Sequence, residues 1–440
     1  MKMEILAKTG AGNGALADHV NGNENGKKAV LDPASGSKGA AWANMGWIFI
    51  LIFAVSDMFS ISIAQISGAL AFVCWVGRLR AEERWPDFTP LKWPMAGFFI
   101  LSLMAAVFSM DPLTSLEDSK DLSHLMIYFV AFDFLVRDTG KIQVLLKVIT
   151  AAGAVIALVG FAQAYKSGIS LDSRISGFND IYMTYAGLLM ICFVSGASAA
   201  AYGVRSWKDS WLFPALAMIL AAILLSLTRN AWIGLAAGTL VVMALRAPKT
   251  LISLPVLAVL SLSAAPQGVK ERFASMFDAK NSTNHERLLV WGSGLKIIKD
   301  YPVFGVGQNC FPKVYGKYMD PGAKEPSISH MHNNFLQIAV ERGTPTLLAW
   351  IMIWLMAAYH MAVGMRAAVA QGNRELAMGI VAGAGVLAAF LSAGFFEYNF
   401  GDTEVQMLFL FLLAIGMASA VSASGSANKE KEGSGGIEPE

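Results

Sequence analysis

Residues 345–365 read PTLLAWIMIWLMAAYHMAVGM, a run of 21 positions without a single Asp, Glu, Lys or Arg. As an α-helix this run would be about 30 Å long, because each residue adds about 1.5 Å, and a bilayer's hydrocarbon core has a similar thickness. Within lipid, the backbone N–H and C=O groups must be satisfied inside the segment itself. The stretch therefore predicts a membrane-spanning helix.

Similar runs recur along the chain, which has 440 residues, of which 55% are hydrophobic and only 15% charged. Its mean hydropathy is +0.51. A soluble domain carries more charge, and a lipid-facing barrel would show short alternating strands, which the sequence lacks. We therefore predict an all-α polytopic membrane protein with about twelve transmembrane helices. The expected spans are residues 42–58, 60–76, 93–108, 122–136, 144–165, 181–203, 211–227, 231–245, 251–265, 345–365, 376–396 and 404–421.

Alternate loops between these spans are rich in Lys and Arg, and the positive-inside rule places those loops in the cytoplasm. They contain Arg78, Arg80, Arg84, Lys92, Arg137, Lys141, Lys147, Arg205, Lys208, Arg246, Lys249, Arg366 and Arg374. The other short loops contain only Lys120, Lys166, Arg174 and Arg229. Both termini are then cytoplasmic, and in a bacterium residues 266–344 face the periplasm from the inner membrane.

These assignments divide the chain into five parts. Residues 1–41 and 422–440 are poor in apolar residues and are expected to be disordered cytoplasmic tails. Residues 42–265 contain the first nine spans, residues 266–344 form one large periplasmic loop carrying amphipathic helices, and residues 345–421 contain the last three spans. The sequence shows no internal repeat of the kind found in many transporters.

Arg229 is the first residue to suggest a function. It lies in SLTRNAWIGLAAGTL, residues 226–240, within a run that is otherwise nearly uncharged. The run fits two spans joined by a tight turn at residues 228–230, and the second span gives only about 22 Å of helix, so the turn should lie below the outer surface. A recessed arginine needs water, a counter-charge or a ligand. It either forms an internal salt bridge or carbonyl cap, or binds an anion such as phosphate through two parallel hydrogen bonds. The turn contains no acidic residue, which favours an external anion.

The long loop contains HERLLVWGSGLKIIKDYP, residues 285–302, which we expect to form an amphipathic helix capped by Asn284 and ended by Pro302. Its apolar stripe would consist of Leu288, Trp291, Leu295 and Ile298. Arg287 falls in the first turn, where the helix dipole disfavours a cation unless a phosphate is bound beside it. Arg287 is therefore either a solvated, snorkelling side chain or a second phosphate ligand.

The loop ends with HMHNNFLQIAVERG, residues 330–343. We expect Ser327 or Ser329 to cap a helix running from about residue 330 to residue 342, with Gly343 just past its end and Pro345 starting the next span. On such a helix His332 shares the buried stripe of Phe335, Leu336 and Ala339. A histidine at a helix N-terminus is biased towards the neutral form that a general base needs. The structural alternative is a histidine satisfied by a backbone carbonyl.

His330 and His332 also offer two possible metal ligands, but no Cys or carboxylate completes a set at a recognisable spacing, so we expect no metal. Glu397, Asp402 and Glu404 cluster in EYNFGDTE, residues 397–404, at an outer membrane edge. These carboxylates either take part in the chemistry or pair with loop arginines, and the sequence suits both alternatives equally.

Three motifs in this order resemble the O-antigen ligase and polymerase superfamily. They are SLTRNAWIG (226–234), RLLVW followed by DYPVFGVG (287–291 and 300–307), and HNNFLQ (332–337) before an apolar span. The resemblance extends from about residue 181 to residue 413, and the plan of many spans with one large outer loop late in the chain is similar too. The segment RISGFND, residues 174–180, resembles an earlier outer-loop element of the family.

Members of that family are GT-C-like membrane glycosyltransferases. The resemblance implies transfer of a glycan from an undecaprenyl-pyrophosphate donor to an acceptor hydroxyl, which in the ligases belongs to the lipid A core. It implies that Arg229 and Arg287, with Arg174 as a secondary contact, hold the donor pyrophosphate, and that His332 is the catalytic base. No cofactor, metal or nucleic acid is expected, and the partners are the two lipid-linked substrates and membrane lipids. Without a carboxylate nucleophile beside these residues, a single inverting displacement is expected.

Alternatives remain within and outside the family. One long outer loop and only a short second one, residues 166–180, favour a ligase over a repeat-unit polymerase, while a protein O-oligosaccharyltransferase would share the same motifs. A lipid-linked glycan transporter or flippase would instead carry charges at the middle of several spans, and Asp133 is the only mild support for it.

Overall fold

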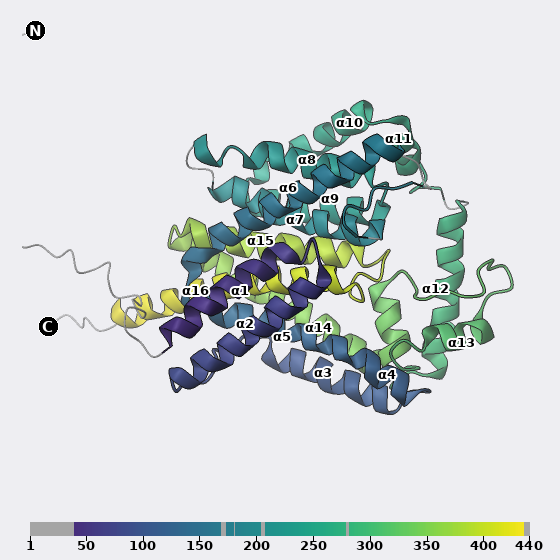
Figure 1. The fold of residues 1–440 in the computed structure, drawn as a ribbon, viewed down its shortest axis with the longest axis horizontal. Helices are drawn as coiled ribbons and strands as arrows, with labels where there is room; N and C mark the ends of the chain where they lie inside the picture. Colours follow the sequence, from purple (N-terminus) through teal and green to yellow (C-terminus); the bar gives the residue numbers. More distant parts are fainter. Residues whose placement is uncertain (1–38, 169–172, 180, 204–206, 279–280, 435–440) are drawn as a thin grey trace, which may run out of the picture.

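The computed structural model describes residues 39–168, 173–179, 181–203, 207–278 and 281–434. Within these residues every regular element is a helix (Figure 1). The α-helices are α1 (Ala40–Ser56), α2 (Ile61–Ala81), α3 (Lys92–Val107), α4 (Pro112–Asp118), α5 (Leu125–Arg137), α6 (Ile142–Ser167), α7 (Tyr182–Gly203), α8 (Leu212–Leu225), α9 (Arg229–Arg246), α10 (Ser253–Ala264), α11 (Gln267–Ala274), α12 (Ser282–Asp300), α13 (Phe311–Tyr318), α14 (Asn334–Ala370), α15 (Arg374–Ala393) and α16 (Thr403–Ser434). Short 3-10 helices lie at Ser119–His124, Thr139–Lys141, Trp207–Asp209 and Pro248–Ile252.

Seven helices of the described residues are long and apolar enough to cross a membrane: α2, α6, α7, α8, α14, α15 and α16. Two shorter apolar helices, α1 and α3, accompany them. These findings fit the polytopic all-α class predicted from the sequence. The number of about twelve spans stays a prediction.

The centre of the bundle is formed by α7, α15 and α16, whose apolar segments are largely buried inside the protein. Helix α15 packs against α7, α9, α14 and α16. The α9–α15 contact is close because a Cβ at Gly238 would lie 2.9 Å from both the Ala389 side chain and the Gly385 carbonyl. Small residues allow two helix backbones to approach in this way. The packing fixes α9, and Arg229 at its first position, against the rigid core.

The turn expected at residues 228–230 lies between α8 and α9, with Leu227 in a left-handed conformation at φ 54° and Thr228 at the N-cap position.

The two predicted tails are described only in part. Residues 1–38 of the predicted N-terminal tail lie outside the described residues. The predicted C-terminal tail, from residue 422, is helical up to Ser434 because α16 continues to that position, and residues 435–440 lie outside the described residues.

Helix α14 consists of two helices separated at Gly343, which has φ 80° and ψ 166°. A side chain there would collide with the carbonyl of Val303, so the position requires glycine. The predicted break before Pro345 is therefore present, but the predicted start of the first segment is wrong. Asn333 caps this helix by accepting the Leu336 N–H at 3.0 Å, and the helix begins at Asn334 rather than at His330.

Helix α12 stands beside the bundle and packs against α14 (Figure 1). Its N-cap is Asn281, not Asn284, and it ends at Asp300. Its buried face is formed by Val290, Ser293, Gly294 and Ile297. Of the predicted apolar stripe, Trp291 and Ile298 pack against the buried residues of this region, whereas Leu288 and Leu295 are 54% and 60% exposed on the protein surface.

Candidate active site

The four side chains singled out in the sequence line one cavity of about 490 Å³. Arg174 comes from the segment before α7, Arg229 from the start of α9, Arg287 from the first turns of α12, and His332 from the segment before α14. Arg272 of α11 and Lys324 also line it, against two carboxylates, Glu286 and Glu325. We call this space the arginine cavity. Its excess of positive charge suits an anionic ligand.

Arg229 is only 6% exposed. One of its terminal nitrogens, Nη1, donates to the Ser275 carbonyl at 3.1 Å, so the carbonyl cap considered from the sequence is present. The other, Nη2, is buried and has no hydrogen-bond partner among the described residues. Leaving a buried donor without a partner costs about 1–3 kcal/mol, and more when the donor belongs to a charged group. Such a donor is normally satisfied by a ligand or by water. Half of the guanidinium is therefore used to fix the side chain and half remains for a ligand.

Arg272 was not predicted as a site residue. Its Nε donates to the Leu227 carbonyl at 3.1 Å, which ties α11 to the turn that presents Arg229. Burial and the positive charges of Arg229 and Arg174 lower the pKa of Arg272 to about 10. Cations that depress each other's pKa in this manner form a site that an anion stabilises.

Arg287 is half-buried at the cavity wall, and its Nη2 lies 3.7 Å from Glu397 Oε2. Burial lowers the pKa of Arg287, and the carboxylate of Glu397 opposes that effect. The distance is longer than a direct hydrogen bond, so the pair is loose and the guanidinium can shift towards a ligand. Arg174 stacks on the Tyr182 ring, with its Cζ 4.3 Å from the ring centroid.

His332 contacts Glu397, which lies in the loop between α15 and α16. The Nδ1 atom of His332 is 3.0 and 3.1 Å from the two carboxylate oxygens. A carboxylate at Nδ1 holds the proton on that nitrogen and leaves Nε2 as the atom that can accept one. Burial alone would raise the pKa of Glu397, but the His332 hydrogen bond and the charges of His332, His330 and Arg287 outweigh it and lower this pKa. The arrangement is that of an oriented general base.

The two asparagines after His332 hold this arrangement together. Asn333 Nδ2 donates to the Phe395 carbonyl at 3.0 Å, and the Asn334 amide hydrogen-bonds with Asn399 and the Phe400 N–H. The HNN motif is thereby fastened to the same loop that carries Glu397. His332 precedes the helix and does not share the stripe of Phe335, Leu336 and Ala339, so that part of the sequence interpretation is wrong.

His330 belongs to the same cluster as His332 and Glu397. The rings of His330 and His332 lie 4.3 Å apart, and His330 Nδ1 is 3.7 Å from Glu397. Ligand atoms of His330, His332 and Glu397 all lie within 4.8 Å of one another, so a carboxylate does complete a possible metal-ligand set. A metal ion there would have to replace the His332–Glu397 hydrogen bond and sit near the Arg287 guanidinium, which opposes a second cation.

Residues 214–351 match the sequence model of the family described as O-antigen ligase. This range contains Arg229, Arg272, Arg287 and His332, whereas Arg174 and Glu397 lie outside it. The comparison with curated proteins gave no match.

Proposed function

Since the match over residues 214–351 supports membership of this chain in the O-antigen ligase superfamily, we propose that it is an O-antigen ligase. The protein transfers a polysaccharide from undecaprenyl pyrophosphate to a sugar hydroxyl of the lipid A core. The reaction takes place at the periplasmic face of the inner membrane. The observation that carries the proposal is the unpartnered Nη2 of Arg229 in a cavity that also contains Arg287 and His332.

The arginines bind the donor. Arg229 and Arg287 hold the pyrophosphate, with Arg174 and Arg272 as further contacts. Guanidinium groups bind phosphate oxygens through paired hydrogen bonds and are always charged. They therefore stabilise the negative charge that develops as the pyrophosphate leaves, and no metal is required for this role.

His332 acts on the acceptor. Its Nε2 takes the proton of the acceptor hydroxyl as the oxygen attacks the anomeric carbon of the donor. The new glycosidic C–O bond forms while the bond from the anomeric carbon to the phosphate oxygen breaks, and undecaprenyl pyrophosphate leaves. The configuration at the anomeric carbon inverts, because the step is a single displacement. Glu397 is the positioning residue that fixes the tautomer of His332 and stabilises the imidazolium.

The topology proposed with this function has about twelve spans, cytoplasmic termini and a periplasmic segment 266–344 that carries Arg272, Arg287 and His332. Alkaline phosphatase fused after residue 324 should be active, and the same fusion after residue 373 should be inactive. The opposite pattern would overturn the orientation.

The function is tested with purified protein, an undecaprenyl-pyrophosphate-linked polysaccharide and lipid A core from a strain without its own ligase. Wild type should produce lipid A core capped with polymer, and Arg229→Ala, Arg287→Ala and His332→Ala should reduce the rate by at least about 100-fold. Arg80→Ala and His360→Ala are matched controls, because neither residue lines the arginine cavity. Both controls should keep wild-type rates.

The product separates the related activities. Polymer attached to lipid A core indicates a ligase, lengthening of the lipid-linked glycan indicates a repeat-unit polymerase, and glycan on a polypeptide indicates a protein O-oligosaccharyltransferase. Movement of the donor across a bilayer without a new glycosidic bond would indicate a flippase. Asp133, the one charge that suggested a transporter, is paired with Arg84, whose Nη2 lies 2.7 Å from its carboxylate. A normal rate for His332→Ala would refute the assignment of the base.

A further inference from the structure

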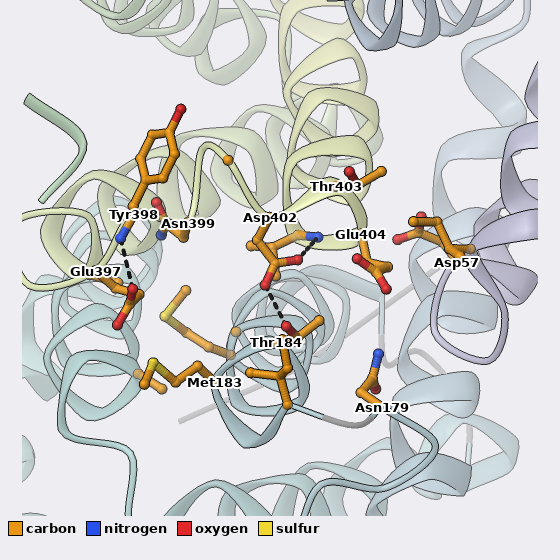
Figure 2. A pocket seen from close by; sticks show the side chains of 18 of the residues that line it. Asp57, Asn179, Met183, Thr184, Glu397, Tyr398, Asn399, Asp402, Thr403 and Glu404 are labelled. Atoms are coloured by element: carbon orange, nitrogen blue, oxygen red, sulfur yellow. Dashed lines mark hydrogen bonds between the residues drawn. The ribbon is translucent and has the colours of Figure 1, made fainter. Parts of the chain in front are cut away.

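A second cavity, of about 600 Å³, adjoins the arginine cavity and has the opposite charge. The two share Met183 and Asn230 in their walls. The second cavity is lined by the carboxylates of Asp57, Glu397, Asp402 and Glu404, and no Lys or Arg of the described residues lines it. Figure 2 shows these acidic side chains around one space, with Asn179 and Thr184 on its lower side. We call it the acidic cavity.

Asp57 is the most informative residue of this cavity. It follows α1, is 1% exposed, and neither of its carboxylate oxygens has a hydrogen-bond partner among the described residues. In Figure 2 its side chain extends towards Glu404. The Oδ1 atom of Asn179 is also buried and has no partner within the part of the chain that the structure describes. Buried polar groups are normally hydrogen-bonded, so two unpartnered acceptors in one cavity point to a ligand that donates.

Other side chains of the cavity offer both donors and acceptors. Asp402 accepts hydrogen bonds from the Thr184 hydroxyl and from the Val405 N–H. Burial raises the pKa of Asp402 to about 7. Near neutral pH this carboxyl group is therefore protonated in part of the molecules. A protonated carboxyl donates one hydrogen bond and still accepts others, which matches hydroxyl groups.

The same groups are poorly arranged for a single metal ion. Among the His, Cys, Asp and Glu side chains of the described residues, only His330, His332 and Glu397 bring three ligand atoms within 4.8 Å of one another. Asp57, Asp402 and Glu404 do not form such a set. The cavity also has an apolar wall, where the rings of Phe59 and Phe178 lie 5.5 Å apart. A cavity of this size with an apolar wall and a few spaced polar groups is typical of a site for an organic ligand.

We propose that the acidic cavity binds the acceptor sugar, with Asp57, Asn179 and Asp402 holding its hydroxyl groups. The inference rests on the proposed function, because that function supplies an acceptor that is a sugar. The position of the acidic cavity supports this assignment. Glu397 and His330 line the acidic cavity, His332 lines the arginine cavity, and His332 is hydrogen-bonded to Glu397. The base thus lies at the boundary between a cavity for an anionic donor and a cavity for a hydroxyl-rich acceptor.

The test compares Asp57→Asn, Asn179→Ala and wild type in the transfer assay. Lipid A core is varied at saturating donor, and the donor is then varied at saturating lipid A core. Each substitution removes one acceptor of hydroxyl hydrogen bonds, so the KM for lipid A core should rise about tenfold while the KM for the donor is unchanged. The reverse pattern, a higher donor KM with an unchanged acceptor KM, is expected for Arg229→Lys. Asp138→Asn is the matched control, because Asp138 lines neither cavity.

A direct binding measurement keeps the two proposals apart. Core oligosaccharide released from lipid A by mild acid should bind wild-type protein in calorimetry, and Asp57→Asn should weaken that binding about tenfold. If wild type transfers no glycan yet binds the oligosaccharide through Asp57, the proposed function fails and the sugar site stands. If wild type transfers glycan and both variants keep the wild-type acceptor KM, the sugar site is wrong.

Two further outcomes bear on the inference. A chelator would overturn the proposal if it removed wild-type activity, a divalent cation restored that activity, and Asp57→Asn abolished the restoration. Such a result would show that the cavity holds a cation. Should Asp57→Asn unfold, protection of Asn179→Ala against thermal unfolding decides the question. Undecaprenyl pyrophosphate should protect Asn179→Ala as well as it protects wild type, whereas core oligosaccharide should protect it less. Equal protection by the oligosaccharide would overturn the proposal.

Discussion

Replacing Glu397 by glutamine tests the function of the histidine–carboxylate pair. The Glu397 carboxylate accepts the His332 Nδ1 hydrogen bond and the Tyr398 N–H at 3.0 Å. Both donors reach Oε1, while Oε2 lies 3.1 Å from His332 Nδ1. A glutamine can keep an oxygen at the first position, but it is uncharged and places an NH₂ group at the second, so the charge-assisted hydrogen bond to His332 is lost. A hydrogen bond to a charged group contributes about 1.5–3 kcal/mol, and losing it in the transition state corresponds to a decrease of about 10- to 100-fold in kcat.

The same substitution should not weaken donor binding. Arg287 loses a carboxylate 3.7 Å away and its positive charge becomes more available to pyrophosphate. The transfer assay at varied donor concentration therefore should give a lower kcat with an equal or lower donor KM. In the background of His332→Ala, Glu397→Gln should have little further effect on kcat, because the two residues act as a unit. An unchanged kcat for Glu397→Gln, or a loss confined to donor KM, would refute this reasoning.

Three other outcomes are expected. Arg229→Lys should raise the donor KM about tenfold in the transfer assay, since a lysine ammonium cannot both bind the Ser275 carbonyl and contribute a second nitrogen to the phosphate; an unchanged donor KM would contradict the phosphate assignment. Gly343→Ala should lower the thermal unfolding midpoint, because a positive φ costs a non-glycine residue about 1–2 kcal/mol and the new Cβ would meet the Val303 carbonyl. Gly292→Ala in α12 is the control and should not lower the midpoint, because open space surrounds that position. Burial raises the folded-state pKa of Asp402 to about 7, so the native protein binds more protons than the unfolded chain between about pH 4 and pH 7. The contribution of Asp402 to stability therefore falls as pH rises through that range. Asp402→Asn should flatten the pH profile of the free energy of unfolding.

The sequence carried the local features of the site. The short apolar segment after Arg229 indicated a turn between two helices, and the structure has that turn, with Arg229 buried at the start of α9. Gly343 followed by Pro345 indicated a helix end and a new start, and the backbone breaks there. These features depend on residues adjacent in the chain, so patterns of hydropathy and of glycine and proline are sufficient to detect them.

Features that depend on distant contacts were not predictable in the same way. Glu397 lies 65 residues after His332. Its acidic neighbours in EYNFGDTE made pairing with loop arginines an equally good interpretation. Glu397 does pair with a loop arginine, Arg287, but it also contacts His332. Arg272 gave no signal, because a lone arginine in a polar segment of a long loop does not differ from a solvated one until the fold places it against Leu227.

The start of α14 was predictable but was placed wrongly. Asparagine is among the preferred N-cap residues, so Asn333 was as good a candidate as Ser327 or Ser329. With the cap at Asn333, His332 falls outside the helix and takes a left-handed backbone conformation with φ 49°. Such a conformation costs a non-glycine residue about 1–3 kcal/mol and persists only where surrounding contacts determine it.

Those contacts explain why the motif contains two asparagines rather than one. Asn333 caps α14 and donates to the Phe395 carbonyl, while Asn334 donates to Asn399 and accepts from the Phe400 N–H. Together they hold the strained residue His332 against the loop that carries Glu397. A helical residue 332 would point wherever its helix face directs it, whereas this arrangement sets the ring by contacts to the carboxylate itself. Histidine, cap and second asparagine therefore form one structural unit, and the geometry of the base should depend on Asn334 as much as on Glu397, although Asn334 lines neither cavity.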